Sequence, residues 1–309
     1  MSVRSIRLAI SFLAAAAVAL AAASSALAND TKSSNWAGYA VHRSGVKFKK
    51  VSGTWKLPAA SCTPGSPTFS STWVGLGGFS GNSNALEQIG SEADCKTSGR
   101  MATSVWYELV PAPSHTIRMK VHPGDTIRAT VTVVGKTTTV SLDDLTRHTS
   151  YTKTATLSHV DVSSADWIVE APSQCRGASF CRVLPLANFG SATFTRARAV
   201  TTTGHRGSIS NRKWETTRIT LASSGQHFVD SSDSATVAQA SVSPLAAAGG
   251  AFTVTYSAST SEPTPPTTQN PPPTTTNPTP GAGDLARRAP NIAQGPSRAS
   301  HPALINASR

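Results

Sequence analysis

The sequence predicts an all-β fold, an antiparallel sandwich of two sheets. Apolar and polar residues alternate with a period of two over residues 127–133, and the same texture returns over 137–142 and 252–256. This period is typical of strands with one buried face. Turn residues such as Gly135 and Lys136 separate the runs, and no window of helical length shows a 3.6-residue period. Many short strands joined by Gly, Pro and Ser turns favour a sandwich.

The N-terminal residues 1–28 predict a signal peptide. Arg4 and Arg7 give a positive start, residues 8–23 are almost continuously apolar, and Ala26-Leu27-Ala28 offers small residues at a cleavage site. A membrane anchor is the competing interpretation, but the run is short and is followed by Ser24-Ser25. We therefore expect a secreted protein with no membrane association after the signal is removed.

Composition divides the rest of the chain into three zones. Residues 29–257 are rich in Thr, Val, Ser and Gly and are long enough for one β-sandwich domain. Residues 258–283 form a Pro/Thr-rich linker, and residues 284–309 are polar and rich in small residues. Such tracts are extended and solvated. We expect a disordered tail without a role in the fold.

The cysteine content fits an exported protein. An even number of cysteines in an oxidising compartment suggests disulfides. Cys175 and Cys181 close a short loop, which leaves Cys62 to pair with Cys95. Zinc is the alternative, but paired CxxC units and a neighbouring histidine cluster are missing from the sequence. We therefore expect two disulfides and no metal.

The chain is strongly basic, with 28 Lys plus Arg against 16 Asp plus Glu and a formal net charge of +12. Nucleic acid is the obvious partner for such a balance. The basic residues are scattered, however, and no Lys/Arg run is interleaved with aromatic residues. We interpret the charge as a solvated basic surface and expect no nucleic-acid partner.

The common catalytic signatures are missing. The sequence has no GxSxG, HExxH, Walker or Rossmann pattern, and its eight histidines are dispersed. Three regions stand out from the Thr/Ser background, because each places a polar group beside or inside an apolar run. They are Thr72–Gly78 with Leu86–Glu92, Val105–Pro111, and Ala165–Glu170. If the protein is an enzyme, its chemistry rests on carboxylates, amides and aromatic groups.

The alternation of side chains along a strand predicts which residues of these regions share a face. In a strand, Asp166, Ile168 and Glu170 share one face, and Leu86 and Gln88 share one face of another strand. Glu170 could then point into a cleft while the intervening residues pack in the core. The competing interpretation is that Gln88 and Glu170 are solvent-facing residues of ordinary strands.

These regions, in this order, resemble the eqolisins, the glutamic peptidase family. Its members carry a Trp-Val-Gly-Ile-Asp-Gly stretch, a Leu-Gln-Thr-Gly-like stretch, a Trp-Tyr-Glu stretch and a Trp-Ile-Val-Glu-like stretch. Further segments match in order: Ser34–Gly38, Val51–Trp55 with Leu57-Pro58, the small loop between Cys175 and Cys181, Leu184–Gly190 and Phe252–Tyr256. The resemblance covers nearly the whole of residues 29–257.

The resemblance implies a concanavalin A-like jelly roll whose concave face hydrolyses peptide bonds at acid pH. It implies polypeptide substrates, a monomer and no cofactor. Glu170 would act as the base on a water molecule, and the amide of Gln88 would stabilise the oxyanion. The implied site residues are the catalytic Gln88 and Glu170 and the substrate-binding Trp36, Trp73, Trp106 and Glu108.

The sequence departs from the fungal eqolisin pattern at two positions. Gly77 stands where the Trp-Val-Gly-Ile-Asp-Gly stretch has Asp, and Glu92 matches an Asp found shortly after the catalytic glutamine. Gly77 removes a carboxylate from the neighbourhood of the cleft. We therefore expect activity that extends towards neutral pH.

Three other functions stay open at this point. A non-catalytic sandwich could bind carbohydrate or protein through Trp36, Trp73 and Trp106. A serine or aspartic hydrolase could bring dispersed catalytic residues together in space. A family member with Gly77 could also have lost activity.

Overall fold

The computed structural model describes residues 29–81, 83–176, 180–224 and 236–260. The predicted signal peptide at 1–28 and the predicted tail at 284–309 lie outside these residues, as does most of the predicted linker. Strand β18 ends at Thr260, three residues past the expected domain boundary at 257. Among the described residues, no helix has the length and hydropathy to cross a membrane.

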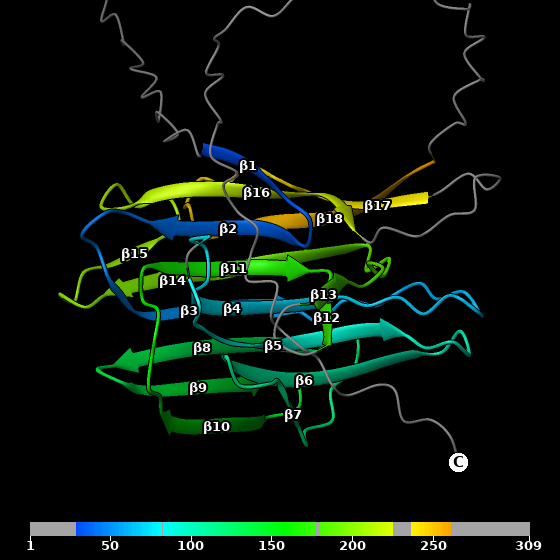
Figure 1. Cartoon of the computed structure of the whole chain (residues 1–309), viewed down its shortest axis with the longest axis horizontal. Helices are drawn as coiled ribbons and strands as arrows, with labels where there is room; N and C mark the ends of the chain where they lie inside the picture. The colour runs from blue at the N-terminus through cyan, green and yellow to red at the C-terminus, as the bar shows by residue number, and fades with distance from the viewer. Residues whose placement is uncertain (1–28, 82, 177–179, 225–235, 261–309) are drawn as a thin grey trace, which may run out of the picture.

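All of the regular structure in the described chain is β, and it forms two layers joined along one edge. The front sheet contains, in order, β7 (His115–Ile117), β6 (Met101–Val110), β5 (Leu86–Cys95), β4 (Ser71–Gly77), β11 (Ser164–Glu170), β2 (Trp36–His42), β16 (Glu215–Ser224), β17 (Thr236–Val242) and β18 (Phe252–Thr260). The strands that carry the sequence motifs are therefore direct neighbours at one end of this sheet (Figure 1).

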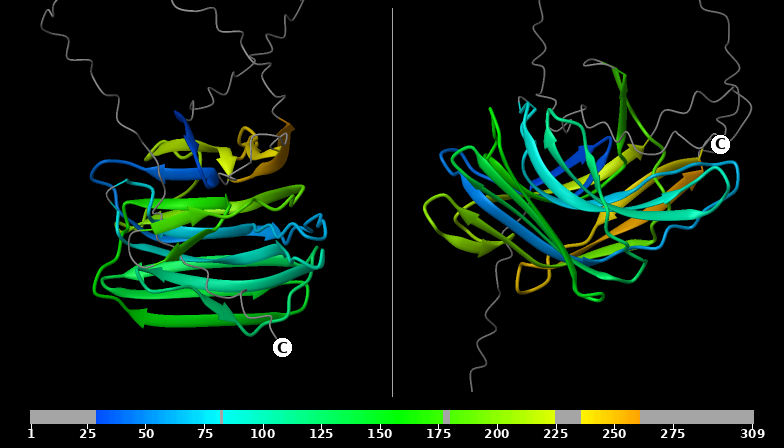
Figure 2. Two further views of the ribbon diagram at one scale, coloured as in Figure 1. Left: turned by 45° about the vertical axis from the view of Figure 1, so that its right-hand side comes forward. Right: turned by 90° about the horizontal axis from the view of Figure 1, so that it is seen from below.

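The back sheet contains β10 (Thr149–Thr156), β9 (Thr137–Asp144), β8 (Thr126–Val134), β3 (Phe48–Lys56), β14 (Ser191–Thr201) and β15 (Arg206–Ser208). Strand β14 joins the two layers: its first part pairs with β18 and its second part with β3. The register shifts between Thr195 and Arg198, and Arg196 there has φ of 52°. A bulge of this kind bends a strand, so one strand can serve both layers. The view from below in Figure 2 shows the two curved layers.

Two smaller elements complete the fold. Strands β12 (Ser173–Arg176) and β13 (Phe180–Val183) form a separate two-stranded hairpin directly after β11. Strand β1 (Asn29–Ser33) pairs with β16 in parallel, while the other pairings are antiparallel. The expected antiparallel sandwich is confirmed, with this one parallel addition.

The core between the layers follows the alternation in the sequence. Strands β3 and β8 pack on β4, and β8 and β9 pack on β5. Trp167 and Val169 of β11 lie in the main core cluster, whereas Ile168 lies in a second cluster with Trp36, Trp73 and Trp106. The faces predicted for β11 are thus confirmed. The front sheet buries one face in the core and carries the second cluster on its other face.

One predicted disulfide is present and the other stays a prediction. Cys62 and Cys95 are bonded, with 5.3 Å between their Cα atoms and 33 residues between them. This bond ties the loop before β4 to the end of β5. Cys181 is also disulfide-bonded, and Cys175 is the residue opposite it in the β12–β13 pairing. The described residues contain no free cysteine.

Candidate active site

The candidate site lies on the face of the front sheet that points away from the core. The register of β11, β4, β5 and β6 places Asp166, Gly75, Gln88 and Glu108 in one row across the sheet. A parallel row, four residues further along the strands, contains Glu170, Ser71, Glu92 and Ser104. We call this surface of β2, β11, β4, β5 and β6 the acid face. It brings together carboxyl groups that are up to 78 residues apart in sequence, Glu92 and Glu170.

Glu170 stands at the end of β11 and is held by three neighbours. Trp73 Nε1 donates to Glu170 Oε2 at 2.8 Å, and Asn35 Nδ2 donates to Oε1 at 3.2 Å. Ser33 Oγ donates to Asn35 Oδ1 at 3.2 Å, which orients this amide so that its NH₂ group meets the carboxylate. Trp36, the partner of Glu170 in the β2–β11 register, supplies a third side-chain hydrogen bond.

The protonation of Glu170 reflects two opposed effects. Burial leaves it 4% exposed and disfavours its ionised form, while the hydrogen bonds from Trp73, Trp36 and Asn35 favour it. Burial wins, and the pKa of Glu170 rises from 4.5 to about 7. A carboxyl group with a pKa in this range can both accept and return a proton near neutral pH.

Gln88 and Glu108 form a second pair, side by side on β5 and β6. Gln88 Nε2 lies 2.7 Å from Glu108 Oε2, and both side chains are buried. Burial, and then the charge of Glu170, raise the pKa of Glu108 well above its ordinary value, while the hydrogen bond with Gln88 lowers it. Because the charge of Glu170 acts on Glu108, the Gln88–Glu108 pair and Glu170 share one electrostatic environment.

The tryptophans predicted to bind substrate pack around Glu170. Trp36 and Trp73 meet edge to face, with ring centroids 5.0 Å apart and planes at 78°. Trp106 lies opposite Gly90, which in turn lies opposite Trp73. A Cβ at Gly90 would lie 2.5 Å from Trp73 Cβ, so glycine here lets β5 lie close to β4 at Trp73. Direct contact of the three indoles with substrate stays a prediction.

The surroundings of Gly77 differ from those that the sequence predicts. Gly77 was expected to remove a carboxylate from the neighbourhood of the cleft, but the side chain of Asp161 lies in that place. A Cβ at Gly77 would be 2.5 Å from Asp161 Cβ, and Gly77 has φ of +81°. Asp161 Oδ2 accepts from the Gly78 amide at 3.1 Å and from Ser83 Oγ at 2.5 Å. A carboxylate from the segment before β11 therefore occupies the space beside Gly77.

Two further residues of the site were not among the site residues predicted from the sequence. Asn35 contacts Glu170 across 135 residues, and its position beside Trp36 was the only available hint. Asp166 is fully buried on the acid face and accepts from Ser164 Oγ at 3.0 Å. Burial raises the pKa of Asp166 well above its ordinary value. Its alternation with Glu170 on β11 was the available signal.

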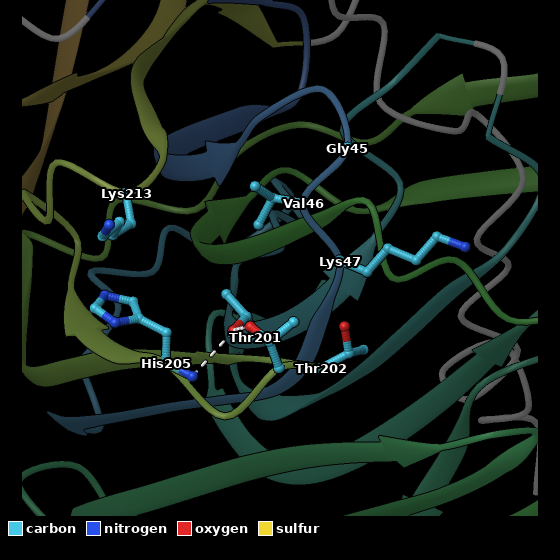
Figure 3. Close-up of a pocket in the computed structure, with 8 residues that line it drawn as sticks. Gly45, Val46, Lys47, Thr201, Thr202, His205 and Lys213 are labelled. Carbon is cyan, nitrogen blue, oxygen red and sulfur yellow. Dashed lines mark hydrogen bonds between the residues drawn. The ribbon is translucent and has the colours of Figure 1, made fainter.

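A separate hollow of about 350 Å³ lies on the turns that follow β2 and β14. Figure 3 shows its lining, where the His205 amide donates to Thr201 Oγ1 at 3.1 Å. Lys47 and Lys213 also line it, and no carboxyl group does. This hollow therefore offers no carboxyl group for acid–base chemistry.

The strands of the acid face lie within a segment that matches a known protein family. A model of the peptidase A4 family matches residues 34–243, a stretch that contains every candidate site residue. The chain belongs to the peptidase A4 family. It is a glutamic-type endopeptidase, and the resemblance to eqolisins is confirmed. None of the curated proteins matches this sequence.

Two solved structures with TM-scores above 0.5 agree with the fold of this A4-family peptidase. Scytalido-glutamic peptidase with a transition-state analogue inhibitor matches at 23% identity and a TM-score of 0.55, over 72% of this chain and 98% of that one. The same enzyme with a peptide-based transition-state analogue matches at 22% identity and a TM-score of 0.51, over the same shares of the two chains. Aspergilloglutamic peptidase from Aspergillus niger is 28% identical, with a TM-score of 0.45, over 62% of this chain and 99% of that one.

Proposed function

We propose that this A4-family peptidase hydrolyses peptide bonds in polypeptides with Glu170 as the proton-transfer group and Gln88 as the oxyanion donor. The observation that carries the proposal is the set of N–H donors aimed at Glu170, because they hold an ionised carboxylate in one fixed place on the acid face. No residue in this pair needs to form a covalent bond to the substrate.

The steps balance as a simple hydrolysis. Ionised Glu170 removes a proton from water while the water oxygen attacks the substrate carbonyl carbon. The carbonyl oxygen becomes an oxyanion, which accepts a hydrogen bond from the Gln88 amide. Glu170 then gives its proton to the nitrogen, the C–N bond breaks, and a carboxylic acid and an amine leave. Trp73, Trp36 and Asn35 hold Glu170 throughout.

The pH range proposed for hydrolysis is weakly acidic to neutral. It is the upper part of the acid range that the resemblance implies. A base must be ionised, and the pKa of Glu170 is about 7. The rate should therefore fall as pH decreases below this value. This range rests on the pKa of Glu170 and not on Gly77, because Asp161 supplies a carboxyl group beside that glycine.

We also propose that the protein acts outside the cell and as a monomer. The Cys62–Cys95 bond supports an oxidising compartment, where such bonds persist. The signal-peptide pattern at residues 1–28 supports export.

The test is hydrolysis of unfolded casein across pH by the wild type and by Glu170→Gln. The substitution preserves shape and removes the base, so hydrolysis should fall close to background while the thermal transition is retained. Gln88→Ala should cost ~10²–10³ in rate, as loss of an oxyanion donor typically does. A folded Glu170→Gln variant with near-wild-type activity would refute the proposal. A folded wild type that binds but never cleaves unfolded protein would instead favour a binding module.

A further inference from the structure

The contact between Gln88 and Glu108 has two possible polarities. The observed pair places Gln88 Nε2 2.7 Å from Glu108 Oε2, which suits an amide N–H that donates to an ionised carboxylate. Within the described chain, Gln88 Oε1 and Glu108 Oε1 are buried and have no hydrogen-bond partner. The end of the amide that points away from Glu108 is then a carbonyl oxygen.

A carbonyl oxygen at that end cannot stabilise an oxyanion, because both are hydrogen-bond acceptors. The two ends of a glutamine amide are nearly equal in size, so the group can turn by 180° without a change in packing. A neutral Glu108 could donate its O–H to Gln88 Oε1. The turned amide would then direct its NH₂ group away from Glu108.

The surroundings of Glu108 favour its neutral form. The acids on the same face are Glu170 and Asp166 on β11 and Glu92 and Asp94 on β5. The residues of β2, β11, β4, β5 and β6 that pair with one another in the described chain include no Lys or Arg. Further along, His42 has its pKa lowered by burial, so it adds no positive charge near neutral pH. Several buried acids without a counter-ion cannot all ionise at once.

We propose that Glu108 is a positioning residue that selects which end of the Gln88 amide faces the substrate. An ionised Glu108 binds the NH₂ group and leaves the carbonyl oxygen outward, whereas a neutral Glu108 binds the carbonyl and turns NH₂ outward. The inference rests on the proposed function of Gln88 and Glu170. The active form then has Glu170 ionised and Glu108 neutral, so the two groups hold one proton between them.

This arrangement assigns the two limbs of the pH–rate profile. Loss of rate at low pH follows protonation of Glu170, and loss of rate at high pH follows ionisation of Glu108. The order is consistent with burial, and then with the charge of Glu170, which together hold the pKa of Glu108 well above its usual range. The two limbs belong to an interacting pair, so each reports the state of both groups.

Glu108→Gln tests the assignment, because a second amide can donate to Gln88 Oε1 at every pH. The high-pH limb of kcat in this variant should move up by about one unit or more, whatever happens to the maximal rate. Glu92→Gln is the matched control: it removes a carboxylate of the same face that accepts from Ser104 Oγ and whose charge is the smallest influence on Glu108, so it should move that limb by less than about half a unit. If the high-pH limb of the Glu108→Gln variant stays at the wild-type pH, the proposal is overturned.

A second measurement does not depend on hydrolysis. Infrared spectroscopy can detect neutral carboxylic acids directly. Near neutral pH, the Glu170→Gln variant should show a carboxylic-acid band that is absent from the double variant Glu170→Gln/Glu108→Gln. The side-chain NH₂ resonances of ¹⁵N-labelled Gln88 should shift with the same titration. If this titration is observed but no peptide cleavage is found, the proposed function fails and the Glu108–Gln88 coupling stands. A fully ionised Glu108 below neutral pH would overturn the coupling itself.

Discussion

Trp73→Phe tests the electrostatic account of Glu170 directly. The indole Nε1 donates to Glu170 Oε2 at 2.8 Å, and phenylalanine keeps an aromatic ring but has no N–H group. A hydrogen bond to a charged group contributes about 1.5–3 kcal/mol. Since one pKa unit corresponds to about 1.4 kcal/mol, the pKa of Glu170 should rise by about one to two units.

The sign follows from which form the bond favours. The N–H group stabilises ionised Glu170, so its loss favours the protonated form and raises the pKa. If Glu170 acts as the base, the low-pH limb of kcat/KM should move to higher pH by the same one to two units. At a pH below both limbs, the rate should then fall by about 10- to 100-fold. The measurement is kcat/KM for an unfolded protein substrate at closely spaced pH values.

The control separates electrostatics from packing. Trp55 is also buried, and its Nε1 donates to Ser91 Oγ at 2.9 Å in the main core, away from the acid face. Trp55→Phe should lower stability without moving the limb. An unchanged limb in folded Trp73→Phe would refute the role of the indole. A limb that moves to lower pH would refute the assignment of Glu170 as the base.

Two predictions concern stability. Gly77→Asp should not restore a family-like site but should destabilise the protein by more than about 2 kcal/mol, because φ is +81° and Asp161 fills the space. Gly135→Asp, at φ of +60° with nothing within 4 Å, measures the backbone cost alone, and equal melting temperatures for both variants would contradict the clash. The pKa of Glu170 is raised in the folded state, so the native protein binds more protons than the unfolded chain between pH 4.5 and about 7, and stability should fall as pH rises through this range. A melting temperature that increases from pH 4 to pH 8 would contradict this, and Glu170→Gln should reduce the dependence.

The sequence by itself determined the fold class and the faces of the strands. Alternation is a local property, since successive side chains of a strand point to opposite sides. Residues 127–133 were therefore recognisable as a strand, and they form part of β8. The separation of Ile168 and Glu170 from Trp167 on β11 followed from the same rule. The order of short motifs was enough to recognise the family, because several weak patterns in one order are jointly specific.

Tertiary structure decided what surrounds each of these groups. The alternation placed Gln88 and Glu170 on strand faces but could not tell a solvated face from a buried one. The buried position of both side chains, and the resulting pKa of Glu170, depend on Trp36, Trp73 and Asn35 from other strands and loops. Asp161 beside Gly77 was equally out of reach, since 84 residues separate them. Hydrogen bonds and desolvation act over a few ångströms in space, and only the folded chain sets those distances.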